Sequence, residues 1–248
     1  MSNLKNKVAL VTGGSRGIGA AIVKRLAADG AAVAFTYLNA EDKANTLVKE
    51  IQSKGGKAVA IKADSADTKA AAAAVENTVK LLGRLDILVN SAGVTTFNTI
   101  DNHEGDLAEV ERLMAVNLTG VSASVRAATK HLPEGGRVIS IGSTFAERLP
   151  YAGFADYAAS KAAIAAYTRG WARDLGKKGI TVNTVQPGPT ATDMNPDNSD
   201  FSESIKAGLA LGRYGKVEEI ASVVSFLAGP DASFVTGSTV TVDGGQNA

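Results

Sequence analysis

The chain has 248 residues, with 26 basic and 25 acidic side chains, no cysteine and two histidines. This length suits one α/β domain, and the near balance of charge offers no broad attraction for nucleic acid or an anionic membrane. The lack of cysteine excludes disulfides and thiol catalysis, and His103 and His131 show no local metal-ligand spacing. We therefore expect a single domain over residues 1–248, no metal site, no membrane span and a cytoplasmic location.

A strand, a glycine-rich turn and a helix open the chain. Residues 8–11 form a short apolar run, and residues 20–29 have a helical pattern that ends at Gly30. Between them lies Thr-Gly-Gly-Ser-Arg-Gly-Ile-Gly, residues 12–19. Glycines allow backbone N–H groups to approach a pyrophosphate closely, and a helix N-terminus favours negative charge. This order of elements predicts a nucleotide-phosphate site, although a plain strand-to-helix turn can share the pattern.

The second predicted strand, residues 32–37, bears on the choice of cofactor. An acidic side chain at its end would bind the adenosine ribose and repel a 2′-phosphate, and residues 35–39 contain none. Arg16 lies in the glycine loop, where its guanidinium can pair with a phosphate. The sequence therefore predicts a preference for NADPH over NADH, with a solvent-directed Arg16 as the alternative.

The middle of the chain continues the alternation of helices and strands. An amphipathic helix is predicted over residues 41–54 and a strand over 58–62, followed by Asp64. Its carboxylate is placed either to accept a hydrogen bond from adenine or to cap the helix that begins near Asp67. After a helix over 70–82, the strand 85–90 runs into small residues, and we expect Asn90 mainly to tie strands together, with cofactor lining as a secondary effect.

A long helical pattern over residues 107–130 contains Asn117 within an apolar run. A buried amide needs hydrogen-bond partners, and asparagine is poorly favoured in the middle of a helix. Asn117 is therefore expected to have a specific use.

Ser143, Tyr157 and Lys161 form the strongest catalytic candidate. Ser143 follows a predicted strand over residues 137–141, and Tyr157 and Lys161 share one face of an alanine-rich helix over 155–166. A phenol titrates near pH ~10, so a fixed cation is needed to favour its ionised form, and Lys161 is placed to supply one. The alternative is an ordinary surface pair. Because ligands bind at the carboxyl ends of parallel strands, Ser143 and Tyr157 can converge on one substrate oxygen.

The last third of the chain supplies a predicted lid. A strand over 181–185 is followed by residues 186–192, which leave its carboxyl end, and then by the polar stretch 193–212 with one short helical piece. Such a stretch is typical of a substrate lid or of an ordinary surface loop. A helix over 217–228 and a strand over 239–242 complete the pattern. The alternation predicts an α/β fold with a doubly wound parallel sheet of the Rossmann type.

Several motifs together resemble the short-chain dehydrogenase/reductase (SDR) family over residues 5–245: TGGSRGIG, NSAG, VNLTG, QPG and VDGG, with Ser143, Tyr157 and Lys161. The resemblance implies a catalytic tetrad with Asn117. In it Tyr157 protonates a carbonyl oxygen as hydride arrives from the nicotinamide, and Ser143 holds the same oxygen. Lys161 contacts the nicotinamide ribose and lowers the phenol pKa, while Asn117 holds a water. The family spacing to Tyr157 would select Thr144, but the strand end matches Ser143.

The expected cofactor, NADPH or NADP+, is assigned a further set of contacts. Besides Tyr157 and Lys161 they are Gly13, Ser15, Arg16, Gly17, Ile18, Gly19, Tyr37, Asp64, Ser65, Asn90, Ala92, Gly93, Pro187, Gly188, Thr190 and Thr192. The resemblance implies a homotetramer and the reduction of a ketone to a secondary alcohol. The expected pocket walls suit a small or medium apolar ketone; besides the lid they are Thr95, Thr96, Phe97, Phe145, Leu149, Tyr151 and Phe154. Two alternatives remain: a 3-oxoacyl-carrier-protein reductase, and a cyclic-di-GMP-binding regulator on the same fold.

Overall fold

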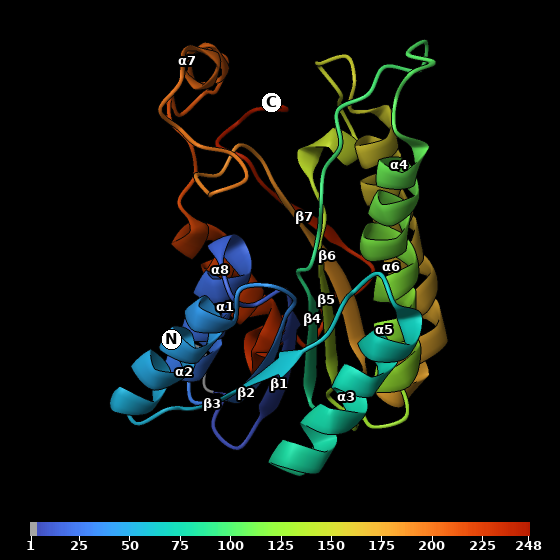
Figure 1. The fold of residues 1–248 in the computed structure, drawn as a ribbon. Coiled ribbons are helices and arrows are strands. Elements are labelled where there is room, and N and C mark those ends of the chain that lie inside the picture. Colours follow the sequence, from blue (N-terminus) through green and yellow to red (C-terminus); the bar gives the residue numbers. More distant parts are fainter. Residues whose placement is uncertain (1–3) are drawn as a thin grey trace.

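A seven-stranded parallel sheet forms the centre of the computed structural model, which describes residues 4–248 (Figure 1). The strand order is β3-β2-β1-β4-β5-β6-β7, so the chain builds outward from β1 to β3 and then crosses to β4. This reversal leaves a crevice at the carboxyl ends of β1 and β4. The predicted doubly wound sheet is confirmed. Its strands are β1 Val8–Thr12, β2 Ala32–Tyr37, β3 Lys57–Lys62, β4 Ile87–Asn90, β5 Arg137–Ile141, β6 Thr181–Pro187 and β7 Thr239–Val242.

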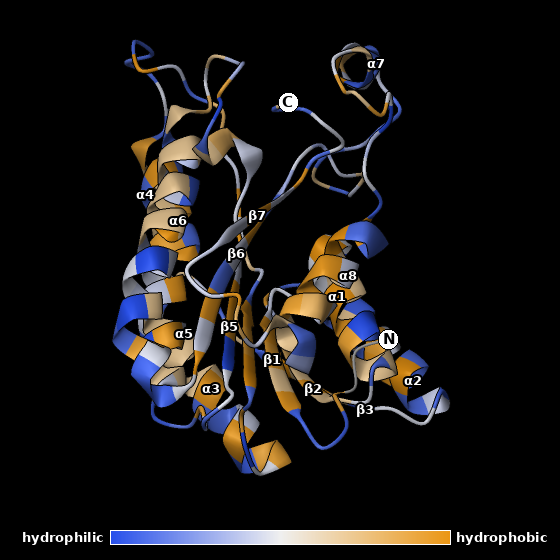
Figure 2. Ribbon diagram, turned by 180° about the vertical axis from the view of Figure 1, so that it is seen from behind, coloured by the Kyte–Doolittle hydropathy of each residue, from blue (hydrophilic) through white to orange (hydrophobic). Residues whose placement is uncertain are grey.

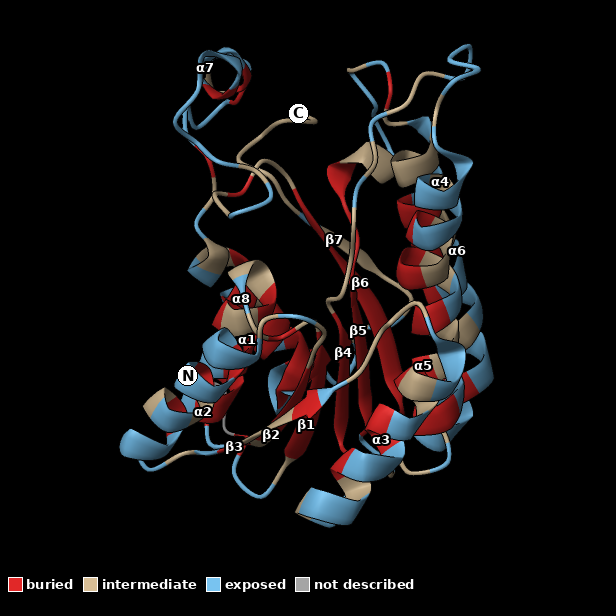
Figure 3. Ribbon diagram, in the orientation of Figure 1, coloured by how far each residue is buried: buried red, intermediate tan, exposed pale blue. Residues whose placement is uncertain are grey.

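Helices cover both faces of the sheet. One face carries α1 Gly17–Ala28, α2 Glu41–Ser53 and α8 Val217–Ala228; the other carries α3 Thr68–Leu82, α4 Leu107–Met114, α5 Gly120–Ala128 and α6 Ala155–Leu175 (Figure 1). Each face has its own apolar core cluster. The central strands are apolar (Figure 2) and buried (Figure 3), as parallel strands covered on both faces must be. Among residues 4–248, no helix has the length and apolarity to cross a membrane.

The helix predicted over residues 107–130 is interrupted and ends at Ala128. A π-helical segment, Ala115–Thr119, separates α4 from α5 and carries Asn117. Directly after it, Gly120 packs against Ser65, and a Cβ at this glycine would overlap the Ser65 carbonyl oxygen. Periodicity does not reveal an inserted residue of this kind, although π-segments are frequent at functional sites.

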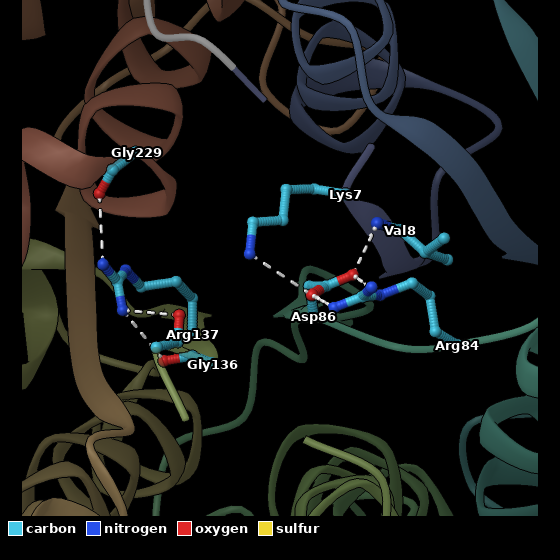
Figure 4. A network of polar contacts seen from close by, with 8 residues as sticks. Lys7, Val8, Arg84, Asp86, Gly136, Arg137 and Gly229 are labelled. Carbon is cyan, nitrogen blue, oxygen red and sulfur yellow. Dashed lines mark hydrogen bonds and ion pairs between the residues drawn. The ribbon is translucent and has the colours of Figure 1, made fainter. Parts of the chain in front are cut away.

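A charge network holds the edge of the sheet opposite the crevice (Figure 4). The buried carboxylate of Asp86 accepts two hydrogen bonds from Arg84, at 2.6 and 2.8 Å, and one from the β1 backbone at 2.9 Å, and Lys7 lies 3.5 Å away. Arg137, at the start of β5, donates to the carbonyl of Gly229 after α8, at 3.3 Å. These contacts fix the strands and α8 to each other away from the site.

The segment of residues 193–212 carries the short helix α7, Asp200–Ala207. Ser199 caps it, since its hydroxyl accepts from the Ser202 N–H at 3.1 Å. Ile205, Leu209 and Tyr214 form a small apolar cluster beneath it, apart from the two main cores. The segment is thus folded as a separate piece on the carboxyl side of the sheet.

Candidate active site

A cleft of about 1180 Å³ runs along the carboxyl ends of the strands. The glycine turn between β1 and α1 lines one part, the loops after β4 and β5 line another, and the 193–212 segment lies opposite. All the predicted catalytic and cofactor residues line it except Asn90 and Asn117. The cleft is therefore lined by side chains from several loops that are far apart in the sequence.

Ser143 and Tyr157 meet in this cleft. Ser143 directly follows β5, and Tyr157 lies in the first turn of α6. Burial raises the pKa of the Tyr157 phenol, and a hydrogen bond with Ser143 acts in the opposite direction. Ser143 is itself oriented by the Phe145 N–H, which donates to its Oγ at 3.2 Å. The hydroxyls of Ser143 and Tyr157 therefore lie next to each other in the cleft.

Lys161 lies one turn further along α6 and is buried. Its Nζ donates to the Ile141 carbonyl at 2.9 Å and lies 5.7 Å from the centre of the Tyr157 ring. Burial lowers the pKa of Lys161 to about 8. The ammonium was expected to bring the phenol pKa below its ordinary value. Burial of Tyr157 outweighs the Ser143 hydrogen bond, so the pKa of the phenol is raised instead.

Thr144, the alternative catalytic hydroxyl, points elsewhere. Its Oγ1 donates to Gln246 Oε1 at 2.8 Å and lies 3.4 Å from the Pro187 carbonyl oxygen. The structure therefore brings Ser143, and not Thr144, to the phenol.

Asn117 supports the cleft wall from behind. Its Nδ2 donates to the Val94 carbonyl at 2.9 Å and to Ser160 Oγ at 3.1 Å, and its Oδ1 accepts from the Val94 N–H at 2.9 Å. Ser160 in turn donates to the Tyr157 carbonyl at 2.7 Å. Both side-chain N–H groups are used by the protein, so a water at Asn117 would be held as a donor to one of the oxygens of this residue.

The glycine turn has the shape of a phosphate cradle. Gly13 has φ +65°, and a Cβ there would lie 2.7 Å from the Ala92 Cα. Gly17, at φ +52°, begins α1, whose N-terminus has no side-chain cap and no acidic residue in its first turn. Uncapped N–H groups beside a turn that excludes side chains suit a pyrophosphate. These residues fit a dinucleotide cofactor.

Positive charge gathers at the far end of the cleft. Arg16 is exposed there, and Lys43 in α2 lies 3.0 Å from Asp193 of the 193–212 segment. With no acidic residue at the end of β2, these cations suit a 2′-phosphate. The sequence reasoning missed Lys43, although a basic residue in the first turn of the helix after β2 is a readable signal.

Asp64 lines the cleft and is engaged within the protein. Arg112, which the sequence reasoning also missed, donates to it at 3.2 and 3.3 Å, and the Ala66 N–H donates at 2.9 Å. Burial acts to raise the Asp64 pKa, but the hydrogen bonds outweigh it, so the pKa is lowered. Asp64 does not cap α3; Asp67 does, as its carboxylate accepts from two N–H groups of the first turn.

Asn90 makes a contact between strands, the main role that the sequence predicts for it. Its Nδ2 donates to Ser140 Oγ at 3.2 Å and ties β4 to β5, beneath the cleft.

Aromatic rings surround the catalytic phenol. Phe145 lies at their centre, with ring centroids 5.6 Å from Phe154, 6.1 Å from Tyr151 and 6.1 Å from Tyr157. Phe97 packs on Phe154 at 5.5 Å, and Phe201 of α7 packs on Tyr151 at 5.6 Å. Phe97 and Phe201 are 68% and 56% exposed. Of the predicted pocket residues, Leu149 alone does not line the cleft.

Comparisons with known proteins agree with this geometry. Residues 13–247 match a family profile described as enoyl-(acyl carrier protein) reductase. The chain is 46% identical over 245 residues to the cyclic-di-GMP-binding biofilm dispersal mediator protein of Escherichia coli K12, with 98% of each chain covered. A short-chain dehydrogenase/reductase from Serratia marcescens BCRC 10948 superposes with a TM-score of 0.97 at 52% identity, covering 99% of this chain and all of that one. A short chain dehydrogenase from Burkholderia cenocepacia J2315, in complex with NADP, superposes with a TM-score of 0.96 at 48% identity and the same coverage. Sheet, cleft and sequence identity together show that the chain belongs to the short-chain dehydrogenase/reductase family.

Proposed function

We propose that the chain is an NADPH-dependent oxidoreductase that reduces a ketone to a secondary alcohol. The observation that supports this most is the Ser143–Tyr157 hydroxyl pair, with buried Lys161 behind it, in a cleft large enough for a dinucleotide and a substrate. The reduced nicotinamide, when bound, supplies the hydride that the carbonyl carbon receives.

The protein's part of this reaction is proton delivery. Tyr157, whose pKa is raised by burial, stays protonated at neutral pH and can donate its hydrogen to the carbonyl oxygen. Ser143 donates a hydrogen bond to the same oxygen as negative charge develops there. The phenolate left on Tyr157 is favoured by Lys161, which is still largely protonated below its pKa of about 8. Tyr157 is thus the proton donor, Ser143 holds the carbonyl oxygen, and Lys161 stabilises the phenolate.

The residues that would hold the cofactor divide by chemistry. Gly13 and the N-terminus of α1 would hold the pyrophosphate, and Arg16 with Lys43 would hold the 2′-phosphate. Asp64 would accept from the adenine amine with the lone pairs that Arg112 leaves available. The complex of the Burkholderia cenocepacia relative with NADP supports this cofactor.

The aromatic rings indicate an apolar substrate, and an aryl ketone best of all. Phe97 and Phe201 present exposed faces from two different elements of the cleft, and offset or edge-on packing between rings is favourable by about 0.5–1.5 kcal/mol per pair. Phe201 belongs to the 193–212 segment, which we propose acts as the lid over the bound substrate.

The test is oxidation of NADPH, measured by absorbance, with a panel of alkyl and aryl ketones. Tyr157→Phe should lower kcat by at least about 10²-fold, whereas Tyr167→Phe, on the outer face of the same helix, should behave as wild type. Turnover by Tyr157→Phe at the wild-type rate would contradict the proposal. Equal or better kcat/KM with NADH would refute the cofactor assignment.

A second candidate function is binding of cyclic-di-GMP, supported by the 46% identity to the Escherichia coli protein named for it. The phosphate cradle and the cations near Arg16 also suit a nucleotide with two phosphates. Calorimetric titration with cyclic-di-GMP and with NADPH separates the two functions: a tight cyclic-di-GMP complex without ketone reduction would favour the regulator.

An acyl-carrier-protein substrate, as in the description of the matching family profile, is tested in the same assay by a 3-oxoacyl thioester on its carrier. The outcome that would favour it is a kcat/KM well above that of any free ketone.

A homotetramer is the assembly that we propose. Phe226 of α8 and Phe234 before β7 are 45% and 100% exposed, and burial of such side chains favours association. Light scattering after gel filtration would give the mass, and a monomer would refute the proposal.

A further inference from the structure

Residues near the C-terminus form part of the cleft wall. After β7 the Asp243 carboxylate accepts from the N–H groups of Gly245 and Asn247, at 2.9 and 3.0 Å. Gly244 has φ +63°, and its carbonyl accepts from the Leu211 N–H at 3.0 Å. The tail is thus held against the base of the 193–212 segment, and this position brings Gln246 into the lining of the cleft.

The Gln246 amide has a defined orientation. Thr144, buried and adjacent to Ser143, donates to its Oε1 at 2.8 Å, and Arg148 donates to its backbone carbonyl at 3.2 Å. With Oε1 bound to Thr144, Nε2 carries two N–H groups that have no hydrogen-bond partner among residues 4–248. A half-buried donor in a cleft wall is satisfied either by water or by a ligand.

We propose that Gln246 is a specificity-determining residue whose Nε2 donates to a second acceptor oxygen on the substrate. This inference rests on the proposed ketone reduction, because Ser143 and Tyr157 fix the first oxygen, and Gln246, held by the residue that follows Ser143, lines the same cleft. Among the ketones that the aromatic part of the cleft accepts, those with an ester, acyl or hydroxyl oxygen close to the carbonyl, such as 3-oxoesters, are then preferred. Thr144, in this assignment, positions Gln246 and does not touch the reacting carbonyl.

Gln246→Glu is the sharpest test, because glutamate has the same length, still accepts from Thr144, and lacks the two N–H donors. The measurement is the ratio of kcat/KM for ethyl 3-oxobutanoate to kcat/KM for 2-heptanone, which lacks the ester oxygens. One lost hydrogen bond predicts a fall in this ratio of about fivefold, mainly through KM of the ester. Thr144→Val should lower the same ratio, because the amide loses its anchor. Gln52→Glu, on the exposed face of α2, is the control and should leave the ratio at the wild-type value.

The outcomes separate this inference from the proposed function. A wild-type ratio in Gln246→Glu, with an unchanged melting temperature, would overturn the role of Gln246 while ketone reduction stands. If Gln246→Glu does not fold, Gln246→Ala takes its place and is expected to give the same loss. No NADPH oxidation by the wild-type protein with either ketone would refute the proposed function, and the inference with it.

Discussion

Replacing Lys161 with methionine separates the energetic cost of a buried charge from its catalytic use. Lys161 is buried, and burial lowers its pKa from 10.5 to about 8. Methionine has a similar volume and no charge, so Lys161→Met removes the titration and the Nζ bond to the Ile141 carbonyl together. We expect this variant to fold and to lose at least about 10²-fold in kcat.

The energetic cost of burying the Lys161 charge can be read from how the free energy of unfolding changes with pH. Because the folded-state pKa lies about 2.5 units below the unfolded value, the unfolded chain holds a proton that the folded protein has released between about pH 8 and pH 10.5. Wild-type stability therefore rises with pH through this range, by about 1 kcal/mol between pH 7 and pH 9. Lys161→Met lacks this gain.

The assay is urea unfolding of wild type and Lys161→Met at pH 7, 8 and 9, followed by fluorescence. Between pH 7 and pH 9 the free energy of unfolding of the wild type should rise by about 1 kcal/mol relative to that of Lys161→Met, since the other titrating groups are the same in both proteins. Lys49→Met, at an exposed position on α2, should show no such change. A difference that stays constant, or moves toward the variant as pH rises, would refute the burial argument.

Three further substitutions test other parts of the structure. Ser143→Ala should lower kcat for ketone reduction by about 10²-fold, while the Kd for NADPH, from fluorescence titration, stays at its wild-type value. If the affinity for NADPH fell by the same factor as kcat, a role confined to the carbonyl would be refuted. Asp86→Ala should lower the free energy of unfolding in urea by about 1–3 kcal/mol, because it leaves the buried Val8 N–H without its acceptor. A loss below about 0.5 kcal/mol would show the network to be dispensable. Gly120→Ala should lower the free energy of unfolding by about 1–3 kcal/mol, since its Cβ meets the Ser65 carbonyl oxygen. Gly170→Ala, with open space around it in α6, should raise the melting temperature. A lower melting temperature for Gly170→Ala than for Gly120→Ala would contradict the packing.

Local geometry made some of the site predictable. A helix places residues four apart on one face, so Tyr157 and Lys161 had to be neighbours once α6 was recognised. The glycine turn is similarly local, because Gly13 and Gly17 must adopt positive φ between one strand and the next helix. The alternation of apolar runs was enough to predict the sheet, since parallel strands covered on both faces need no other pattern.

Contacts between distant segments were not predictable in the same way. Gln246 reaches Thr144 only because the residues after β7 lie against those after β5. Lys43 meets Asp193 only because the start of the 193–212 segment comes close to the first turn of α2. Whether the pKa of Tyr157 is raised or lowered depends on how completely the neighbouring elements exclude water. This is a property of packing that the spacing of residues in the sequence does not reveal.

The anchored tail has a practical consequence for handling the protein. Gln246 lies in the cleft wall, so an affinity tag or fluorescent fusion joined shortly after it would begin beside the cleft. Leu4, by contrast, is hydrogen-bonded at the far end of α1, through its N–H to the Asp29 carbonyl at 2.9 Å. Purification handles are therefore better placed on that side of the molecule, away from the cleft.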